Sequence, residues 1–429
     1  MSKTFWCPRW TVLFSVVSCL VCADRGALSA DAADWPRFRG PNGTGQSSAA
    51  GIPVEIGEES NRLWKIELPG AGNSSPVVAD GRIYLQTSSS DGSERRLLCI
   101  DLQSGRTLWT RSAPGGPGVT HRKNTLASCT GAVADGRVFM PFWDGKRLTV
   151  SAYEIDGHPL WTTDLGEFTS QHGAGHSPIV VDDHVIIMND QDGLAEVVAL
   201  EARTGAVAWK TPRHAFRASY ATPVVIERAG HGPEVVVAST DGVAGYDPKT
   251  GTECWKWIWA SNKQELRTVA SPVVCNDQLF FSGGNGPGAR HAVAINLKGK
   301  ESDDTPHFAW ETLKDFPYVP CLLSRGDNVY FINDSGVAGG FHAATGRRLW
   351  LERLPGGDVT ASPVMIEDRI YAFTENGATF VFAADTQFKL LAEGKLAEGV
   401  KASPAVADGR LIVRGEKSLY CFGRPTPAQ

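Results

Sequence analysis

Apolar and polar residues alternate along most of this chain in short runs, and most runs end at a turn signal such as Asp-Gly. The segment Ser74–Gly92, SSPVVADGRIYLQTSSSDG, holds two such runs with a turn after each of them. Alternation with a period of two is typical of β-strands that bury one face, and Gly-containing pairs between such runs favour tight hairpin turns. The pattern therefore predicts an all-β chain built from short antiparallel strands.

The same arrangement of strands and turns recurs eight times. A Ser-Pro or Thr-Pro pair opens six copies, and two degenerate copies begin at Thr130-Gly131 and Cys321-Leu322. Successive copies start 41 to 55 residues apart, at positions 76, 131, 178, 223, 272, 322, 363 and 404. Four strands in a repeat of this length form one blade of a β-propeller. We therefore predict an eight-bladed β-propeller of four-stranded antiparallel blades.

A tryptophan recurs near the end of the predicted fourth strand. A large flat side chain at one position of successive blades is expected to pack between neighbouring sheets, burying roughly 200 Å² each time. The predicted blade-docking residues are Trp64, Trp109, Trp161, Trp209, Trp255, Trp310 and Trp350. Leu391 falls where the seventh copy is expected to carry its tryptophan, so we expect that blade interface to be the weakest. Trp143 lies at a second-strand tip and is expected to contribute far less to stability than Trp209.

The eighth copy supplies three strands, and its fourth strand is expected to come from the other end of the chain. The segment NRLWKIEL at residues 61–68 precedes the first copy and carries Leu63-Trp64, which matches Leu349-Trp350 of the sixth copy. We predict that this N-terminal strand completes the last blade and closes the ring, which leaves no open edge. The expected organisation is an extended strap at residues 33–60, the propeller at 61–424 and a tail at 425–429.

Residues 1–32 have the pattern of a secretory signal peptide. Two basic residues precede the apolar run WTVLFSVVSCLVC, and small residues follow, with cleavage expected after Ala32. The apolar run is too short for a comfortable membrane span, and no other segment approaches one. An alternative interpretation is that VVSC is a weak lipobox ending at Cys19. The mature chain is therefore expected to be periplasmic or secreted, or lipid-anchored at the outer membrane.

Charge and cysteine content narrow the partners and the chemistry. Removing residues 1–32 leaves 39 basic and 45 acidic side chains, and this mildly acidic balance disfavours nucleic acid as a partner. Six cysteines lie outside the leader without Cys-x-x-Cys or Cys-Cys spacing. Cys99, Cys275 and Cys421 fall in apolar strand-like runs and are expected to be buried thiols, although some cysteines of an exported protein could pair.

The repeat consensus, Ser-Pro-x-Val-x-x-Asp-Gly-x-Ile/Val-Tyr followed by Leu/Ile-Asp-x-x-Thr-Gly-x-x-x-Trp, resembles the PQQ-type propeller repeat. This is the repeat of the quinoprotein alcohol dehydrogenases and of the BamB-type outer-membrane assembly lipoproteins, and the resemblance covers roughly residues 63–422. The segment DWPRFRGPNGTG at residues 34–45 is also similar to exported PQQ-repeat proteins of planctomycete bacteria. WD40 repeats are disfavoured because no copy ends in Trp-Asp.

Membership of the quinoprotein enzymes would imply a calcium ion held by carboxylate and amide oxygens, an acidic catalytic base, and an adjacent-cysteine disulfide against the quinone. This sequence has no Cys-Cys pair and lacks the signature insertions between blades. We therefore expect no cofactor, with PQQ and calcium as the disfavoured alternative. No catalytic residue is predicted.

In a propeller, the loops that enter the innermost strands open onto one face around the central channel. The predicted ligand-binding ring at this channel mouth consists of Asn73, His121, Arg122, Lys123, Asn124, His172, His176, Arg217, Tyr220, Arg267, Thr268, Tyr318, Asp358, Thr360 and Lys401. Cations, imidazoles and phenols outnumber carboxylates in this set, which suits an anionic or polyhydroxylated ligand, or an extended peptide. No metal site is predicted, because Gly-Ala-Gly between His172 and His176 disfavours a helix that would bring both rings to one side.

Three functions remain open at this point. The favoured one is a noncatalytic exported interaction scaffold, BamB-like in architecture, which binds an envelope or extracellular protein or a polar ligand and acts as a monomer. The second is a propeller that binds a small molecule or polysaccharide, with hydrolase or lyase activity as a variant. The third is a PQQ-dependent dehydrogenase. The sequence does not name the ligand or partner.

Overall fold

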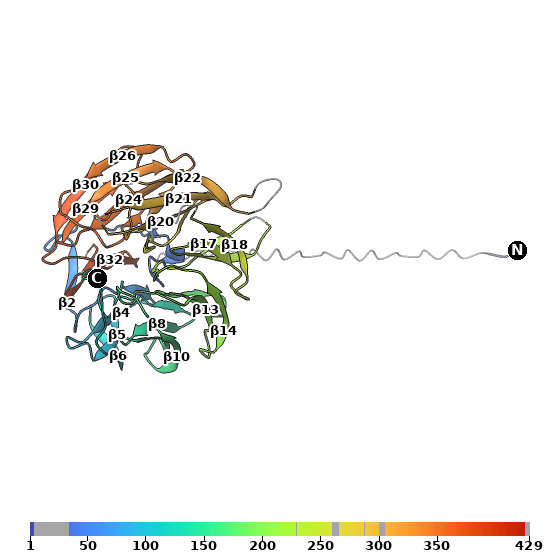
Figure 1. The fold of residues 1–429 in the computed structure, drawn as a ribbon, viewed down its shortest axis with the longest axis horizontal. Coiled ribbons are helices and arrows are strands. Elements are labelled where there is room, and N and C mark those ends of the chain that lie inside the picture. Colours follow the sequence, from blue (N-terminus) through green and yellow to red (C-terminus); the bar gives the residue numbers. More distant parts are fainter. Residues whose placement is uncertain (4–33, 229, 260–265, 287, 300–304, 425–429) are drawn as a thin grey trace. The chain divides into compact units, whose positions relative to one another are not determined.

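Eight antiparallel sheets surround a central axis in the computed structural model (Figure 1). The structure describes residues 1–3, 34–228, 230–259, 266–286, 288–299 and 305–424. The predicted signal peptide, apart from residues 1–3, and the predicted tail lie outside the described residues. Each position predicted to open a repeat is followed by the innermost strand of one sheet, which confirms the eight-bladed propeller. Among the described residues, no helix has the length and apolarity needed to cross a membrane.

The first four blades follow one another along the chain, each running from the axis outward. Blade 1 contains β3 (Val77–Ala79), β4 (Arg82–Ser88), β5 (Glu94–Asp101) and β6 (Thr107–Pro114). Blade 2 contains β7 (Ala132–Ala134), β8 (Arg137–Trp143), β9 (Arg147–Glu154) and β10 (Pro159–Glu167). Blade 3 contains β11 (Ile179–Val181), β12 (His184–Asp190), β13 (Ala195–Glu201) and β14 (Val207–Arg213). Blade 4 contains β15 (Val224–Glu227), β16 (Pro233–Ala238), β17 (Gly242–Tyr246) and β18 (Glu253–Ile258).

The last four blades repeat this arrangement, with two additions from the N-terminal segment. Blade 5 contains β19 (Val273–Cys275), β20 (Gln278–Gly284), β21 (Arg290–Asn296) and β22 (His307–Thr312). Blade 6 contains β23 (Leu323–Arg325), β24 (Asn328–Ile332), β25 (Val337–His342) and β26 (Arg348–Arg353). Blade 7 contains β27 (Val364–Ile366), β28 (Arg369–Phe373), β29 (Ala378–Ala383) and β30 (Leu390–Lys395), with β1 (Gln46–Ser47) parallel to β27. Blade 8 contains β31 (Ala405–Ala407), β32 (Arg410–Arg414) and β33 (Ser418–Phe422).

The fourth strand of blade 8 is β2 (Arg62–Glu67), from the other end of the chain. It pairs antiparallel with β33, and Trp64 lies opposite Cys421. This confirms the predicted closure of the ring by an N-terminal strand. The six described cysteines are free thiols, and Cys254 is the exposed one.

The recurrent tryptophans dock each blade on the next. Six of the seven indole N–H groups donate to a main-chain carbonyl of the following blade, over 2.7 to 3.2 Å, at Trp64, Trp109, Trp161, Trp209, Trp310 and Trp350. At five of these, all except Trp350, a glycine of the following blade lies against the ring. A Cβ on Gly251 would come within 2.4 Å of Trp209, and a Cβ on Gly205 within 2.5 Å of Trp161. In the Thr-Gly-x-x-x-Trp motif, the glycine therefore contacts the preceding blade and the tryptophan contacts the following blade.

Two blades depart from this docking pattern. Trp255 donates to Glu234 within its own blade, where Glu234 forms a buried ion pair with Arg228 at 2.7 Å. In blade 7 the turn before the outer strand is one residue longer, because the Ala383 amide donates to Lys389, six residues on, whereas the Glu201 and His342 amides of other blades donate five residues on. Ala392, which lies opposite Val381 after a β-bulge, therefore replaces tryptophan, and not Leu391 as expected from the sequence. The same bulge precedes the tryptophan in the other blades, and it shifts the strand register by one residue.

The N-terminal strap fills the space that the missing tryptophan leaves. Ile52 and Ile56 are 1% and 2% exposed and belong to a core cluster with residues of blades 7, 8 and 1, against which Ala392 also packs. Thr379 donates to the Ile56 carbonyl at 2.6 Å, so the strap is held by blade 7 itself. The interface expected to be the weakest is therefore reinforced from outside the repeat.

The strap also occupies the central channel, which the sequence did not predict. Trp35 pairs with Val78 of blade 1, and the Val133 amide of blade 2 donates to Pro36. The Arg39 guanidinium, 1% exposed, donates to carbonyls of Leu322 and Pro363 in blades 6 and 7. Next to it lies the short 3₁₀ helix η1 (Pro41–Gly43). One segment thus ties together inner strands of several blades.

A circular chain of hydrogen bonds explains why Ser-Pro and Thr-Pro recur. In seven of the eight blades, the amide at this position donates to the Oγ or Sγ at the same position of the next blade, over 3.0 to 3.3 Å. Cys321 takes the place of the hydroxyl in blade 6, and Ser403 donates to Ser75 to close the circle. The motif is therefore part of the framework that joins the blades.

Trp143 was expected to contribute little to stability, but it lies in the hydrophobic core. It is 4% exposed and belongs to the core cluster of blades 2 and 3, with its ring edge-on to Phe168 at 6.5 Å. The loop that leads from blade 2 into blade 3 carries Phe168 and covers Trp143 at its strand tip. The alignment of the repeats does not predict this cover.

Candidate functional site

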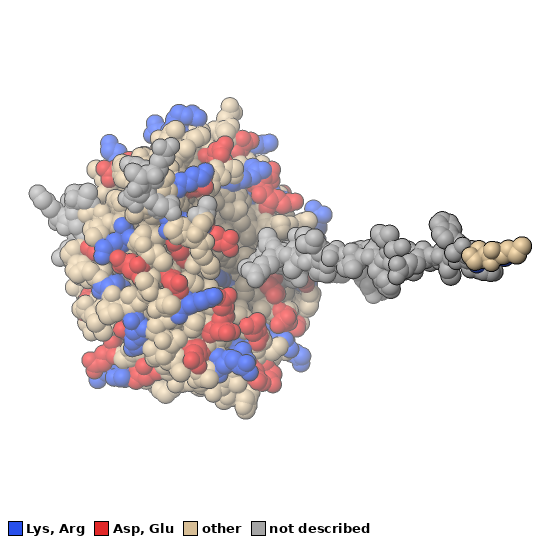
Figure 2. Space-filling model, turned by 90° about the vertical axis from the view of Figure 1, so that its right-hand side faces the viewer, with Lys and Arg blue, Asp and Glu red and all other residues tan. Residues whose placement is uncertain are grey.

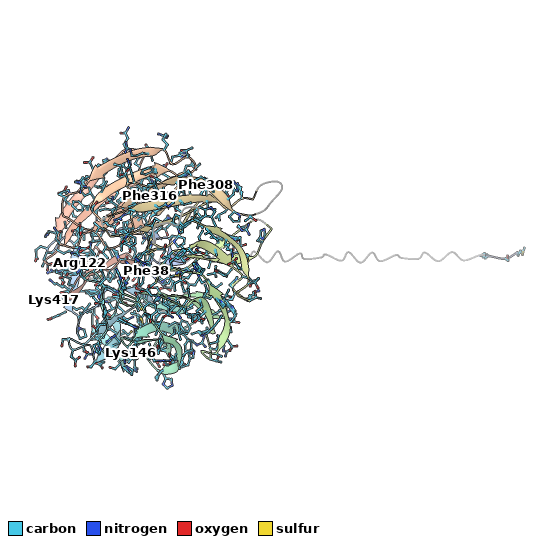
Figure 3. All side chains as sticks on the ribbon, in the orientation of Figure 1. Phe38, Arg122, Lys146, Phe308, Phe316 and Lys417 are labelled. Atoms are coloured by element: carbon cyan, nitrogen blue, oxygen red, sulfur yellow. The ribbon has the colours of Figure 1, made fainter. Side chains whose placement is uncertain are left out.

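The loops that enter the inner strands surround a funnel at one face of the propeller. Each inner strand starts at this face, so these loops and the tips between the second and third strands lie on the same side. The funnel has a volume of about 660 Å³ and is lined by residues from all eight blades. Phe38, from the strap in the channel, lines it from below, and it is labelled near the middle of the propeller in Figure 3. On the outer side shown in Figure 2, acidic and basic side chains lie interspersed.

The structure brings together most residues of the predicted ring. Those that line the funnel are Asn73, His121, Arg122, Lys123, Asn124, His172, Tyr220, Arg267, Tyr318, Asp358, Thr360 and Lys401. Three others do not line it. His176 and Thr268 are 1% and 0% exposed, and Thr268 donates to the Ser239 carbonyl at 2.9 Å. Arg217 is half-buried beside the blade 4 tip, where its amide donates to Thr240.

One side of the funnel is electrostatically balanced. Lys123 lies 3.0 Å from Asp358 and 2.6 Å from Glu375, and Lys401 lies 3.1 Å from Glu416. These carboxylates are far away in sequence or sit on strand tips, so the predicted excess of cations is cancelled here. Among the funnel-lining cations, Lys123 and Lys401 are therefore neutralised by carboxylates.

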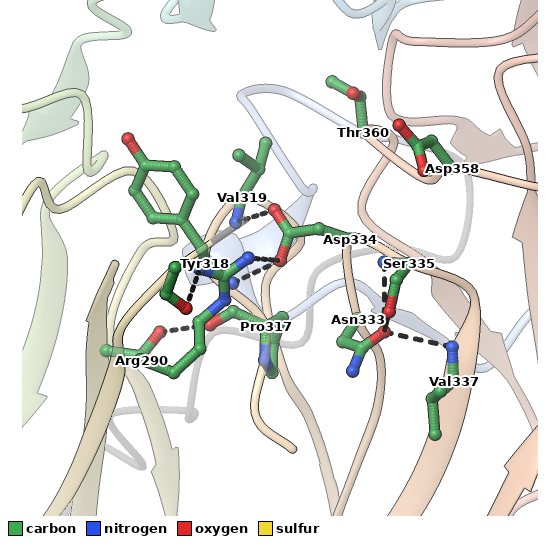
Figure 4. A network of polar contacts seen from close by, with 12 residues as sticks. Arg290, Pro317, Tyr318, Val319, Asn333, Asp334, Ser335, Val337, Asp358 and Thr360 are labelled. Atoms are coloured by element: carbon green, nitrogen blue, oxygen red, sulfur yellow. Dashed lines mark hydrogen bonds and ion pairs between the residues drawn. The ribbon is translucent and has the colours of Figure 1, made fainter. Parts of the chain in front are cut away.

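Asp334 organises the blade 6 part of the wall (Figure 4). Its carboxylate accepts amide protons of Tyr318 at 2.7 Å and Val319 at 3.1 Å, and it lies 3.6 Å from the Arg290 guanidinium. Arg290 also lies over the Tyr318 ring, 5.4 Å from its centroid. Burial raises the pKa of Asp334 against these stabilising contacts. This carboxylate is used to fix the loop and the position of Tyr318. Sequence reasoning missed Asp334, Arg290 and Phe38.

Arg267 and Arg122 also line the funnel. Arg267 is 8% exposed, and its guanidinium donates to Gln171 at 3.0 Å. Among the described residues, neither Arg267 nor Arg122 has a carboxylate within ion-pair distance. His121 and His172 stack beside them, with centroids 4.9 Å apart and rings inclined by 10°.

Burial and the nearby cations lower the pKa of both neighbouring imidazoles. The pKa of His172 is lowered to about 4, first by burial and then by the charges of Arg267 and His121. The pKa of His121 is also lowered, by burial and then by Arg122, Lys123 and Arg267. The His121 Nδ1 accepts the Lys123 amide proton at 3.3 Å, so its neutral ring carries the proton on Nε2. The site thus offers donors around a fixed positive charge.

His176 gives a prediction for the pH dependence of stability. Its ring is fully buried edge-on to Phe168, 4.7 Å between centroids, and burial lowers its pKa to about 4. The neutral ring stabilises the fold above the unfolded pKa of about 6.5, and this contribution is lost as pH falls towards 4, by roughly 3 kcal/mol. We expect wild type to lose stability relative to His176→Gln over this range in urea titrations. Burial raises the pKa of Asp190 to about 6, and this carboxyl contributes to the pH dependence of stability in the opposite direction. Because both proteins contain Asp190, its contribution cancels when their free energies of unfolding are subtracted. A constant difference would contradict the assignment.

The funnel residues do not match a calcium-quinone site. Calcium takes six to eight oxygen ligands, commonly from several carboxylates. The two carboxylates that line the funnel, Asp334 and Asp358, are each engaged by a cation. No group of three or more His, Cys, Asp or Glu suited to a metal occurs among the described residues. The chain also has no adjacent cysteines to form the disulfide platform.

Comparison with known proteins places the chain in a family. A family model described as outer membrane protein assembly factor BamB matches residues 54–150, 146–387 and 319–426. The chain belongs to this family. An outer membrane protein assembly factor BamB from Shewanella oneidensis is 24% identical over 228 residues, which cover 52% of this chain and 51% of that protein. The chain therefore matches about half the length of this curated relative.

Solved structures support the fold of this family member. BamB from Moraxella catarrhalis superposes with a TM-score of 0.61 at 15% identity, covering 86% of this chain and 98% of that one. A europium-containing methanol dehydrogenase superposes with a TM-score of 0.64 at 13% identity, covering 92% and 99%. At these identities the likeness concerns the fold alone, because the same propeller serves a protein-assembly factor and an enzyme.

Proposed function

We propose that this protein is a noncatalytic exported binding scaffold, which uses the funnel face to hold an envelope or extracellular protein or a polar, anionic ligand. It acts as a monomer in the periplasm or outside the cell, released by cleavage after Ala32 or anchored through Cys19. Mass spectrometry of the mature N-terminus distinguishes these two forms.

One observation carries the proposal. A funnel gathers loops from all eight blades above a channel that the strap fills, and two arginines that line it, Arg122 and Arg267, have no carboxylate within ion-pair distance among the described residues. Clefts of about 300–1,000 Å³ with a few convergent polar groups are typical of binding sites. The carboxylates in the wall hold loops and lysines in place, so they are poorly suited to act as a general acid or base.

The two enzyme alternatives make different predictions. A PQQ-dependent dehydrogenase would bind PQQ with calcium and reduce an artificial electron acceptor with an alcohol, both of which absorbance measurements detect. A polysaccharide-binding or glycan-cleaving propeller would bind members of a glycan array. We expect neither result, and the purified protein is proposed to need no cofactor.

Removal of Arg122 and Arg267 is expected to weaken binding strongly. The variant Arg122→Ala/Arg267→Ala should keep the wild-type melting temperature and recover at least tenfold less partner from envelope extract. Capture by wild type should weaken with salt, because charges more than about 8–10 Å apart are screened at physiological ionic strength.

The matched control is Arg106→Ala/Arg203→Ala, which removes the same charge from exposed turns on the opposite face. This control should capture the partner as wild type does. Undiminished, salt-insensitive capture by the funnel variant would place the binding surface elsewhere and contradict the proposal.

A further inference from the structure

Hydroxyl groups that do not donate a hydrogen bond to another described residue form a ring at the bottom of the funnel. We define the hydroxyl crown as the serines and threonines at the Ser/Thr-Pro positions that line the funnel: Ser75, Thr130, Ser177, Thr222, Ser362 and Ser403. Five of these hydroxyl oxygens accept a main-chain amide from the preceding blade. An oxygen that accepts a hydrogen bond still has its own proton to donate. Among the described residues, no acceptor is found for the crown protons.

These donors are nearly enclosed, since each crown residue is 2% to 6% exposed. Their backbones are fixed by the inner strands and by the circular hydrogen-bond chain, so the funnel is the side left open to them. A buried donor without a partner destabilises the fold, because it has lost its hydrogen bonds to water. A ligand rich in acceptor oxygens would therefore gain from every crown hydroxyl that it reaches.

Charge decides which acceptor-rich ligand fits best. Arg267 is 8% exposed in the wall, and its guanidinium donates to the Gln171 amide oxygen at 3.0 Å. After burial, its charge contributes to the lowered pKa of both His121 and His172. Among the described residues, no carboxylate lies within ion-pair distance of its guanidinium. Neutral sugars would satisfy the hydroxyl protons and leave this charge uncompensated.

We propose that the funnel binds a small organic oxyanion, a compound with carboxylate or phosphate groups whose oxygens accept from the hydroxyl crown and whose charge is neutralised by Arg267 and Arg122. This inference rests on the proposed binding function and names its ligand class. The apolar ring of Phe38 and the phenols of Tyr220 and Tyr318 provide the walls for the carbon skeleton. The proton on His121 Nε2 provides a further donor.

Calorimetric titration of the full chain tests the ligand class. Citrate serves as the carboxylate probe, glucose 6-phosphate as the phosphate probe and sorbitol as the neutral probe. We expect one or both anions to bind and sorbitol not to bind. The anion that binds more tightly identifies the group. Binding of sorbitol as tight as that of the anions, or no binding of either anion at millimolar concentration, would overturn the inference.

Two matched pairs of variants test the proposed contacts. Arg267→Gln should weaken anion binding at least tenfold, whereas Arg106→Gln on the opposite face should not. Thr222→Val removes one hydroxyl of the crown. Among the described residues, no main-chain amide donates to the Thr222 hydroxyl oxygen, so the substitution should weaken binding and leave the circular chain of hydrogen bonds intact. Ser271→Ala removes a member of that chain that does not line the funnel, and it should leave the affinity unchanged. Equal affinities within either pair would overturn the inference.

A spectroscopic measurement adds a result that a purely structural role would not give. A bound anion should raise the pKa of His172 and His121, measured by NMR of the imidazole nitrogens, and Arg267→Gln should abolish this rise. If wild type captures its envelope partner but binds no anion, the inference fails and the proposed function stands. If anions bind but capture does not depend on Arg122 and Arg267, a protein-binding role of the funnel fails instead.

Discussion

Deletion of residues 1–68 is expected to remove cooperative thermal unfolding. This segment supplies the fourth strand of blade 8 and four apolar side chains that are at most 5% exposed: Trp35, Ile52, Ile56 and Leu68. At about 1.5–3 kcal/mol for each side chain, their loss costs about 6–12 kcal/mol. This is comparable to the whole free energy of unfolding of a typical domain, about 5–15 kcal/mol. Calorimetry and near-ultraviolet circular dichroism measure the effect.

The control for this deletion is a chain that begins at Asp34. It keeps the described strap, so we expect it to unfold cooperatively at the temperature of the full chain. If the chain that begins at Pro69 melted at that same temperature, ring closure and the strap would contribute little, contrary to the structure.

Replacement of Trp209 by alanine is expected to cost about 3–5 kcal/mol. Trp209 is 9% exposed and packs between blades 3 and 4, its ring against Gly251 and its N–H donating to Pro248 at 3.0 Å. The substitution therefore leaves a cavity and an unpaired carbonyl at one blade interface. Urea unfolding monitored by circular dichroism gives the free energy difference.

Val207 in the same strand provides the matched control, because it is 47% exposed. Val207→Ala should cost less than about 1 kcal/mol, since surface substitutions have small effects. Similar losses for the two variants would mean that the tryptophan position does not carry the blade interface.

The repeat made the fold predictable from sequence. Eight copies of one pattern fixed the number of blades, and the unpaired Leu63-Trp64 segment pointed to the strand that closes the ring. The direction of the inner strands then placed the loops before each Ser-Pro on one face, so most of the predicted ring lies in the funnel. His176, Thr268 and Arg217 do not line the funnel. The pattern of the sequence does not show whether the side chain of a loop residue next to a strand points into the funnel or away from it.

The remaining features depend on contacts that no local pattern encodes. The strap has no repeat. Arg39 holds it in the channel by donating to the carbonyls of Leu322 and Pro363, which are distant in sequence. Lys123 and Glu375 are separated by 252 residues, so their pairing, which balances one side of the funnel, follows from the closed ring. The turn before the outer strand of blade 7 is one residue longer than in most other blades, which is why Ala392 and not Leu391 replaces tryptophan.

Site-specific photo-crosslinking in the cell that produces the protein tests the central claim most directly. A photoreactive amino acid at Arg122, on the funnel face, should form a covalent adduct with the bound partner or ligand, detected by mass spectrometry. The same amino acid at Arg106, on the opposite face, should form none. Adducts from Arg106 together with none from Arg122 would contradict a binding function of the funnel.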